Sequence, residues 1–125
     1  ALNTRDNSLA LYSNHGIDFV EIAAPGSHAY SLDLRKGLVT LQVENQLAES
    51  SGTSFAAPLV SGAAAITYGL FRVRRGKDPK PAEVEAIIRS TATPYKHLTG
   101  KIKGCKTLNL KKLTDTIGTE PASQW

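Results

Sequence analysis

The sequence predicts a fold that combines β-strands with α-helices, because strand-like runs in its first half precede helix-like runs in its second half. Phe19 to Ala24 is a mostly apolar run with β-branched residues, which is typical of a buried strand. Phe55 to Phe71 is a long run of small and apolar residues that predicts a helix. The length of 125 residues favours a single domain.

Four candidate strands lie in the first half of the chain. Leu9 to Tyr12 alternates weakly, and the turn-forming residues 13–16 follow it. Phe19 to Ala24 ends at a Pro-Gly pair, which terminates regular structure. Ala29 to Leu32 and Leu38 to Val43 are the other two candidates, and the second of them alternates apolar and polar residues as a half-buried strand does.

Three helices are expected in the second half. The first runs from Thr53 to about Val73, and its apolar residues lie all the way round, which predicts burial on every side. The second begins at Pro81, because proline is tolerated in the first turn of a helix, and it ends at Thr93-Pro94. The third starts near residue 108. Its apolar stripe comprises Leu110, Leu113 and Ile117.

A serine lies where the loop before the long helix turns into that helix. We expect the hydroxyl of Ser51 or Thr53 to cap the helix. Ser54 then falls in the first turn, beside backbone N–H groups that have no partner inside the helix. These groups and the helix dipole favour a negative charge, such as the oxyanion formed when a serine attacks a carbonyl. Pro58 cannot donate to the Ser54 carbonyl, so we expect a bend in the first turn.

Charge and cysteine content exclude little. The net charge is +4, and the positive residues gather after Ser54 without interleaved aromatic residues or a nucleic-acid motif, so a solvated surface is expected rather than nucleic-acid binding. The run from Ala56 to Phe71 is too short and too rich in Gly and Ala to predict a membrane span. Cys105 is the sole cysteine, and a small, partly buried apolar role is expected for it.

The string from Ser51 to Pro58 resembles the serine motif of the subtilisin-like proteases, the subtilases. It reads Ser-Gly-Thr-Ser-Phe-Ala-Ala-Pro, and the family motif is Gly-Thr-Ser-x-Ala-Ala-Pro, commonly followed by His-Val-x-Gly. Leu59 replaces the usual His. Residues 13–16 and 20–26 are similar to the family's Ser-Asn-x-Gly and Val-Asp-Ile-x-Ala-Pro-Gly segments.

The resemblance extends from Ala1 to about Ile117 and implies an α/β three-layer fold, with a mostly parallel sheet between helices. Residues 1–125 then form the C-terminal section of the catalytic domain. The implied reaction is hydrolysis of peptide bonds in a protein or peptide through an acyl-enzyme on Ser54, whose backbone N–H is an oxyanion donor. The resemblance also implies a secreted or extracytoplasmic location. The candidate substrate-binding residues are Ser51, Gly52, Thr53 and Phe55.

The remaining catalytic groups are expected outside this chain. A serine protease also needs a His base, an Asp that orients the base, and a second oxyanion donor. In the subtilases the Asp, the His and an oxyanion Asn precede the serine motif, and the resemblance places all three before Ala1. His15, His28 and His97 lack the family context of the base. We therefore expect an upstream segment or a second chain to supply these groups, and this chain alone to be inactive.

Two alternatives stay open. A subtilisin-like pseudoprotease or binding module would keep the fold without the chemistry. An α/β-hydrolase would use Ser54, Asp78 and His97 in that order, but Ala56 stands where its motif needs a second Gly, and residues 46–50 make a poor buried strand.

A calcium site is a further implication of the resemblance, since relatives often carry structural calcium. Glu21 stands at a motif position where an acid can be a ligand. The sequence has no cluster of acids at ligand spacing, so we assign no metal ligand and expect Glu21 to face solvent at a strand edge. Structural calcium elsewhere in the full domain stays open, and no other cofactor is predicted.

Overall fold

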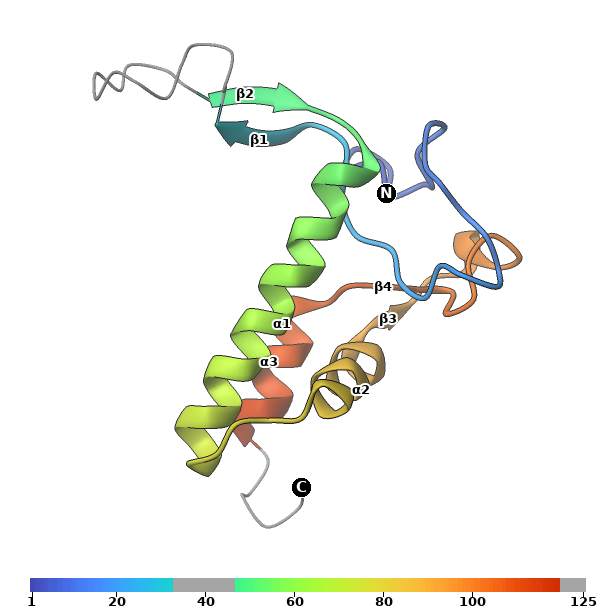
Figure 1. Ribbon diagram of the computed structural model, residues 1–125. Helices are drawn as coiled ribbons and strands as arrows, with labels where there is room; N and C mark the ends of the chain where they lie inside the picture. Colours follow the sequence, from blue (N-terminus) through green and yellow to red (C-terminus); the bar gives the residue numbers. More distant parts are fainter. Residues whose placement is uncertain (33–46, 120–125) are drawn as a thin grey trace.

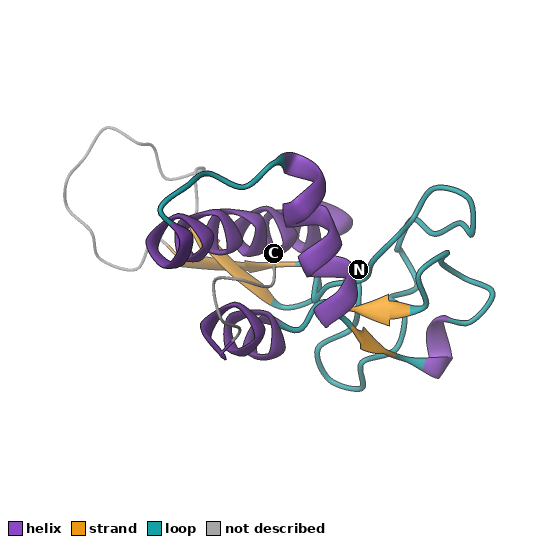
Figure 2. Cartoon of the chain, turned by 90° about the horizontal axis from the view of Figure 1, so that it is seen from below, coloured by secondary structure: helices purple, strands orange, loops and turns teal. Residues whose placement is uncertain are grey.

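The computed structural model describes residues 1–32 and 47–119. Figure 1 shows the chain path, and Figure 2 shows that the three long helices group together while most of the loops lie to one side. The elements, in chain order, are β1 (Ala29–Leu32), β2 (Leu47–Ser50), α1 (Thr53–Arg75), α2 (Pro81–Thr91), β3 (Thr93–Pro94), the 3₁₀ turn η2 (Lys96–Leu98), β4 (Lys106–Thr107) and α3 (Leu110–Thr119).

The main core lies between the three helices. Phe71 of α1 and Leu113 of α3 are fully enclosed there, together with Ile87 of α2. The apolar stripe predicted for the last helix is confirmed at Leu113 and Ile117, but Leu110 is exposed. The Asn109 carboxamide oxygen accepts a hydrogen bond of 2.8 Å from the Lys112 N–H, which caps α3 at its start.

The long helix α1 begins at the predicted residue and ends at Arg75, close to the predicted end. The prediction that this helix is buried on every side was wrong for this chain. Its buried residues lie on one face, and Ile66 remains 42% exposed. The buried residues are Ala56, Ala63, Thr67 and Phe71. The physical reason is that the main helical contacts of α1, with α2 and α3, fall on this one face.

The length and composition of α1 alone would allow it to cross a membrane, which the sequence did not predict. Core helices of soluble proteins have the same property. Because α1 packs its buried face against α2 and α3, we treat it as a helix of the helical core.

Single β-bridges join short segments beside the helices. Leu2 pairs with Leu9 on one side and with Pro25 on the other, and Ala23 pairs with Thr107 of β4, which in turn pairs with β3. A further bridge joins Gly16 to Ile102, and three of these isolated bridges are parallel, but the described residues contain no continuous parallel sheet. The α/β class is supported, and the mostly parallel sheet stays a prediction.

Two predicted strands were wrong. The segment from Phe19 to Ala24 is buried only at its last two residues, and Phe19 is 90% exposed. Within this segment Ala23 alone forms a β-bridge, and the carbonyls of Val20 and Ala24 accept single hydrogen bonds from Lys103 and Leu2, so no continuous ladder runs along it. In the segment from Leu9 to Tyr12 only Leu9 forms a bridge, and the chain then turns at Leu11.

An antiparallel hairpin precedes α1. The predicted strand β1 is confirmed, and it pairs with β2 in a register that sets Ala29 opposite Ser50. The sequence did not predict β2, because the residues before Ser51 looked unsuitable for a buried strand. A strand in an antiparallel pair can leave one face in solvent, so it does not need an apolar sequence throughout. The predicted strand from Leu38 to Val43 lies outside the described residues. In Figure 1 the hairpin projects beyond the start of α1.

Candidate active site

Ser54 lies exposed in the first turn of α1. The residue that precedes the helix is Gly52, and no side chain caps it, so the predicted cap by Ser51 or Thr53 was wrong. The hydroxyl of Ser51 instead accepts a hydrogen bond of 3.0 Å from the backbone N–H of His28. The Phe55 N–H donates to the Gly52 carbonyl at 3.0 Å.

The turn at Pro25-Gly26 holds the loop in front of Ser54. The Gly52 N–H donates a hydrogen bond of 2.8 Å to the Gly26 carbonyl, which also accepts 2.9 Å from the Tyr12 hydroxyl. A Cβ atom added at Gly26 would lie 2.5 Å from the Ala1 Cβ and 2.8 Å from the Gly52 carbonyl oxygen. Only glycine allows this close approach of two backbones.

The four candidate substrate-binding residues flank the serine directly. Ser51 is exposed, and Gly52, Thr53 and Phe55 are half-buried. Their role in binding stays a prediction. Sequence reasoning missed the contribution of Tyr12, which links the first loop to the turn at Gly26 and carried no motif signal of its own.

No hydrogen bond joins the Ser54 hydroxyl to a histidine or a carboxylate among residues 1–32 and 47–119. His15 is exposed in an early loop. His28 is half-buried and contacts the serine loop through its backbone. His97 lies in η2, where its ring centroid is 5.1 Å from that of Tyr95.

The α/β-hydrolase alternative is contradicted by the position of Asp78. Its carboxylate forms an ion pair of 3.5 Å with Arg72. Ser54 and Arg72 lie at opposite ends of α1, and the helical rise of about 1.5 Å per residue separates their backbones by about 27 Å. Asp78 therefore cannot orient a base for Ser54.

Glu21 is partly exposed, as predicted, but it lies outside any strand and forms two ion pairs. Its carboxylate lies 2.8 Å from the Lys103 ammonium and 3.3 Å from the Arg89 guanidinium, and its side chain is 33% exposed. The hydrogen bond from Lys103 and the charge of Arg89 lower the pKa of Glu21. In the part of the chain that the structure describes, no group of three or more His, Cys, Asp or Glu residues could hold a metal ion.

Comparison with known proteins defines the class. The model of the subtilase family matches residues 1–118, so the chain belongs to the subtilase family, a family of serine proteases. A solved structure of the patellamide maturation protease PatA is similar, with 28% sequence identity and a TM-score of 0.55. The match covers 78% of this chain and 33% of that one, so this chain spans about a third of the length of that relative. No curated protein sequence matches.

Proposed function

We propose that this chain is the C-terminal section of a serine endopeptidase that hydrolyses peptide bonds through an acyl-enzyme on Ser54. One observation carries the proposal. Ser54 is exposed in the first turn of a long helix, within a Gly-Thr-Ser-Phe-Ala-Ala-Pro string, in a chain that belongs to the subtilase family. The loop that presents it is fixed by the bond between Gly52 and Gly26.

In the proposed mechanism the Ser54 hydroxyl oxygen attacks the scissile carbonyl carbon, and its proton passes to a His base. The negative charge that develops on the carbonyl oxygen is stabilised by the Ser54 N–H, which lies in the helix turn whose N–H groups lack intrahelical partners. The His returns the proton to the leaving amine, and water then hydrolyses the acyl-enzyme. The Asp, the His and a second oxyanion donor, an Asn, come from an upstream section of the same domain.

The substrate is a protein or peptide that crosses the serine loop beside Ser51, Gly52, Thr53 and Phe55. Phe55 follows the nucleophile directly and would line the leaving-group side. The similar solved structure is that of a maturation protease, which is compatible with peptide cleavage. We also propose a secreted or extracytoplasmic location.

A catalytically inactive subtilisin-like protein is the second candidate, because the described residues bring no base to Ser54. The two candidates differ in one measurable property. An active serine protease reacts covalently with fluorophosphonates through its nucleophile, whereas an inactive homologue does not.

The experiment treats the complete protease domain with a fluorophosphonate probe and locates the modified residue by peptide mass spectrometry. We expect modification at Ser54 and none in the Ser54→Ala variant. Ser61→Ala is the matched control, because Ser61 is exposed on the same helix and its hydroxyl merely bonds to the Ala57 carbonyl. Modification at Ser13, Ser31 or Ser61 would refute the assignment, and a lack of any modification would favour the inactive homologue.

A further inference from the structure

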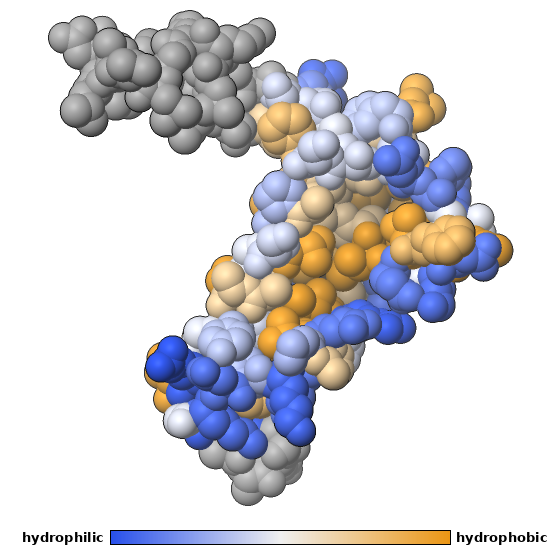
Figure 3. All heavy atoms as spheres, in the orientation of Figure 1, coloured by the Kyte–Doolittle hydropathy of each residue, from blue (hydrophilic) through white to orange (hydrophobic). Residues whose placement is uncertain are grey.

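The end of α1 that lies farthest from the serine loop concentrates positive charge. Arg72, Arg74 and Arg75 lie in its last turn, and Lys77 follows two residues after the helix ends. Arg72, Arg74 and Lys77 are exposed. This end of α1 lies at an extremity of the described chain in Figure 1, and Figure 3 shows strongly hydrophilic residues gathered there. We call residues 72–77 the basic tip.

The one acid next to the basic tip in the sequence neutralises only part of this charge. The Asp78 carboxylate forms the 3.5 Å ion pair with Arg72, and it also accepts a hydrogen bond from the Tyr68 hydroxyl. No ion pair joins Arg74 or Lys77 to a carboxylate among residues 1–32 and 47–119. Two exposed cations of the tip therefore stay unpaired in the described part of the chain.

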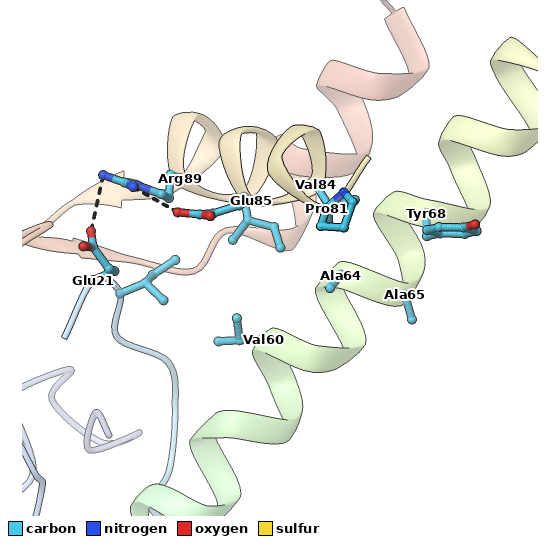
Figure 4. Close-up of a pocket in the computed structure, with 11 residues that line it drawn as sticks. Glu21, Val60, Ala64, Ala65, Tyr68, Pro81, Val84, Glu85 and Arg89 are labelled. Atoms are coloured by element: carbon cyan, nitrogen blue, oxygen red, sulfur yellow. Dashed lines mark hydrogen bonds and ion pairs between the residues drawn. The ribbon is translucent and has the colours of Figure 1, made fainter. Parts of the chain in front are cut away.

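The acids of the neighbouring helices are engaged elsewhere. On α2, the Glu83 carboxylate accepts a 2.7 Å hydrogen bond from the backbone N–H at the start of the helix. Glu85 lies 3.1 Å from the Arg89 guanidinium, as Figure 4 shows. On α3, Asp115 lies 2.6 Å from the Lys111 ammonium. These pairs leave the positive charge of the basic tip available to a ligand.

An apolar side chain stands among these charges. Val73 is 81% exposed, and it lies between Arg72 and Arg74 in the sequence. Cations in the last turn of a helix interact favourably with the helix dipole, which accounts for the arginines. The dipole accounts neither for the exposure of Val73 nor for Lys77, which lies outside the helix. An exposed apolar side chain flanked by cations is typical of a surface that binds an anionic lipid bilayer.

We propose that the basic tip docks this protein on the surface of a membrane that contains anionic lipids. Arg72, Arg74 and Lys77 contact the lipid phosphates, and Val73 enters the headgroup region. Because the tip is an extremity of the molecule rather than a groove, it fits a flat charged surface better than an extended acidic peptide. The helix α1 does not cross the bilayer in this arrangement, since its buried face packs against α2 and α3.

Docking at the basic tip leaves the serine loop in solvent. Ser54 precedes Val73 by 19 residues on α1, a separation of about 28 Å along the axis at the usual helical rise. The nucleophile and the docking surface therefore lie at opposite ends of one helix, and a protein substrate reaches Ser54 without displacing the lipid. This orientation rests on the proposed function, whereas the docking itself does not require catalysis.

The test measures cosedimentation of the complete protease domain with lipid vesicles. The domain carries Ser54→Ala, which prevents self-cleavage. One set of vesicles is phosphatidylcholine alone, and the other contains about a third phosphatidylglycerol, a lipid with one negative charge. We expect binding to the anionic vesicles and none to the neutral ones. Binding should weaken as salt is added, because salt screens the attraction between exposed charges.

Arg74→Gln combined with Lys77→Gln should lower the affinity for anionic vesicles by about 30-fold, since each cation near such a surface contributes a factor of about five. The matched control is Lys96→Gln combined with Lys101→Gln. These lysines are also exposed, and they lie in and after η2, away from the end of α1 in Figure 1. The control should bind as the parent does. Lys77→Glu, outside the helix, is the second variant if the first disturbs folding.

A fluorescent label tests whether Val73 enters the headgroup region. Val73→Cys is made with Cys105→Ala and labelled with a nitrobenzoxadiazole dye, whose emission shifts to the blue in an apolar environment. We expect that shift with anionic vesicles. Thr99→Cys, at an exposed position after η2, is the control that should show no shift.

Three results would overturn the proposal. They are equal binding to neutral and anionic vesicles, equal loss of affinity in the tip and control pairs, and binding to soluble polyglutamate but not to vesicles. The last result would indicate an acidic protein partner. The outcomes also separate this inference from the proposed function. Vesicle binding by a protein that fails to react with fluorophosphonate supports the docking and overturns the serine protease. Reaction at Ser54 in a protein that ignores anionic vesicles does the reverse.

Discussion

The backbone N–H of Gly52 donates a 2.8 Å hydrogen bond to the carbonyl oxygen of Gly26, and this bond ties the serine loop to a turn 26 residues earlier in the chain. A second link runs in parallel, from the His28 N–H to the Ser51 hydroxyl at 3.0 Å. Two links of this kind restrict both the position and the rotation of the loop. The orientation of Ser54 thus depends on the turn as well as on α1.

Gly26→Ala should therefore impair catalysis in the complete domain. The added methyl group would lie 2.8 Å from the Gly52 carbonyl oxygen, which is backbone and cannot rotate away. A shift of the loop by about 1 Å is expected to lower kcat by about 100-fold. The measurement is steady-state peptide hydrolysis together with the melting temperature.

The control for this variant is Gly16→Ala, where an added Cβ meets nothing within 4 Å. It should keep nearly full activity. Wild-type kcat in Gly26→Ala would show that the contact does not position the serine.

Ser54→Ala should abolish hydrolysis by the complete domain without unfolding it. Loss of the nucleophile from a catalytic unit costs a factor of about 10⁶ in rate. Ser54 is exposed, so its removal leaves no cavity, and the circular dichroism spectrum and melting temperature should match those of the wild type. Retention of more than a small fraction of the activity would remove Ser54 from the mechanism.

Glu21→Gln should reduce stability at neutral pH and have less effect in acid. The pKa of Glu21 is lowered by the Lys103 hydrogen bond and by Arg89, so the folded state favours the ionised carboxylate. A group with a lowered pKa stabilises the fold above its unfolded pKa, about 4.3 for Glu. That stabilisation is lost as the pH falls through the lower folded value.

The measurement is the melting temperature of both proteins between pH 7 and pH 3. We expect the difference in melting temperature between the wild type and Glu21→Gln to become smaller below about pH 4. Glu85→Gln is the control, since Arg89 is the only ion-pair partner of Glu85 among the described residues and the Glu85 side chain is 64% exposed. If the melting temperatures of the wild type and Glu21→Gln differ by the same amount at every pH, the charge of Glu21 contributes nothing to stability. If calcium removal lowers the melting temperature and Glu21→Gln leaves that dependence unchanged, the calcium site lies elsewhere.

Local sequence signals predicted the helices of this chain well. Thr53 and Pro81 were identified as helix starts, because a loop-to-apolar transition and a first-turn proline are local features. The string around Ser54 also identified the candidate nucleophile. The long-range partners could not be predicted: nothing near Gly26 in the sequence indicates that its carbonyl would accept from Gly52.

The strands were predicted poorly, and the physical reason is their dependence on neighbours. Ala23 and Thr107 form a bridge across more than 80 residues, and each looks unremarkable alone. Phe19 has the composition of a buried strand residue but is 90% exposed, since no described element covers it. Similarly, Glu21 gained its two cationic partners from α2 and from the loop before β4.

The final prediction concerns residues 1–125 produced as a separate polypeptide. We expect this polypeptide neither to fold stably nor to hydrolyse peptides, because the exposed apolar side chains of α1 lack the cover that an upstream section would provide. The experiment records its circular dichroism, its elution volume and its activity on casein, and then adds the upstream segment. Activity that appears only on mixing would support two sections sharing one catalytic site. A compact monomer that melts cooperatively without the upstream segment would contradict the expectation, and would favour a chain that folds and binds by itself.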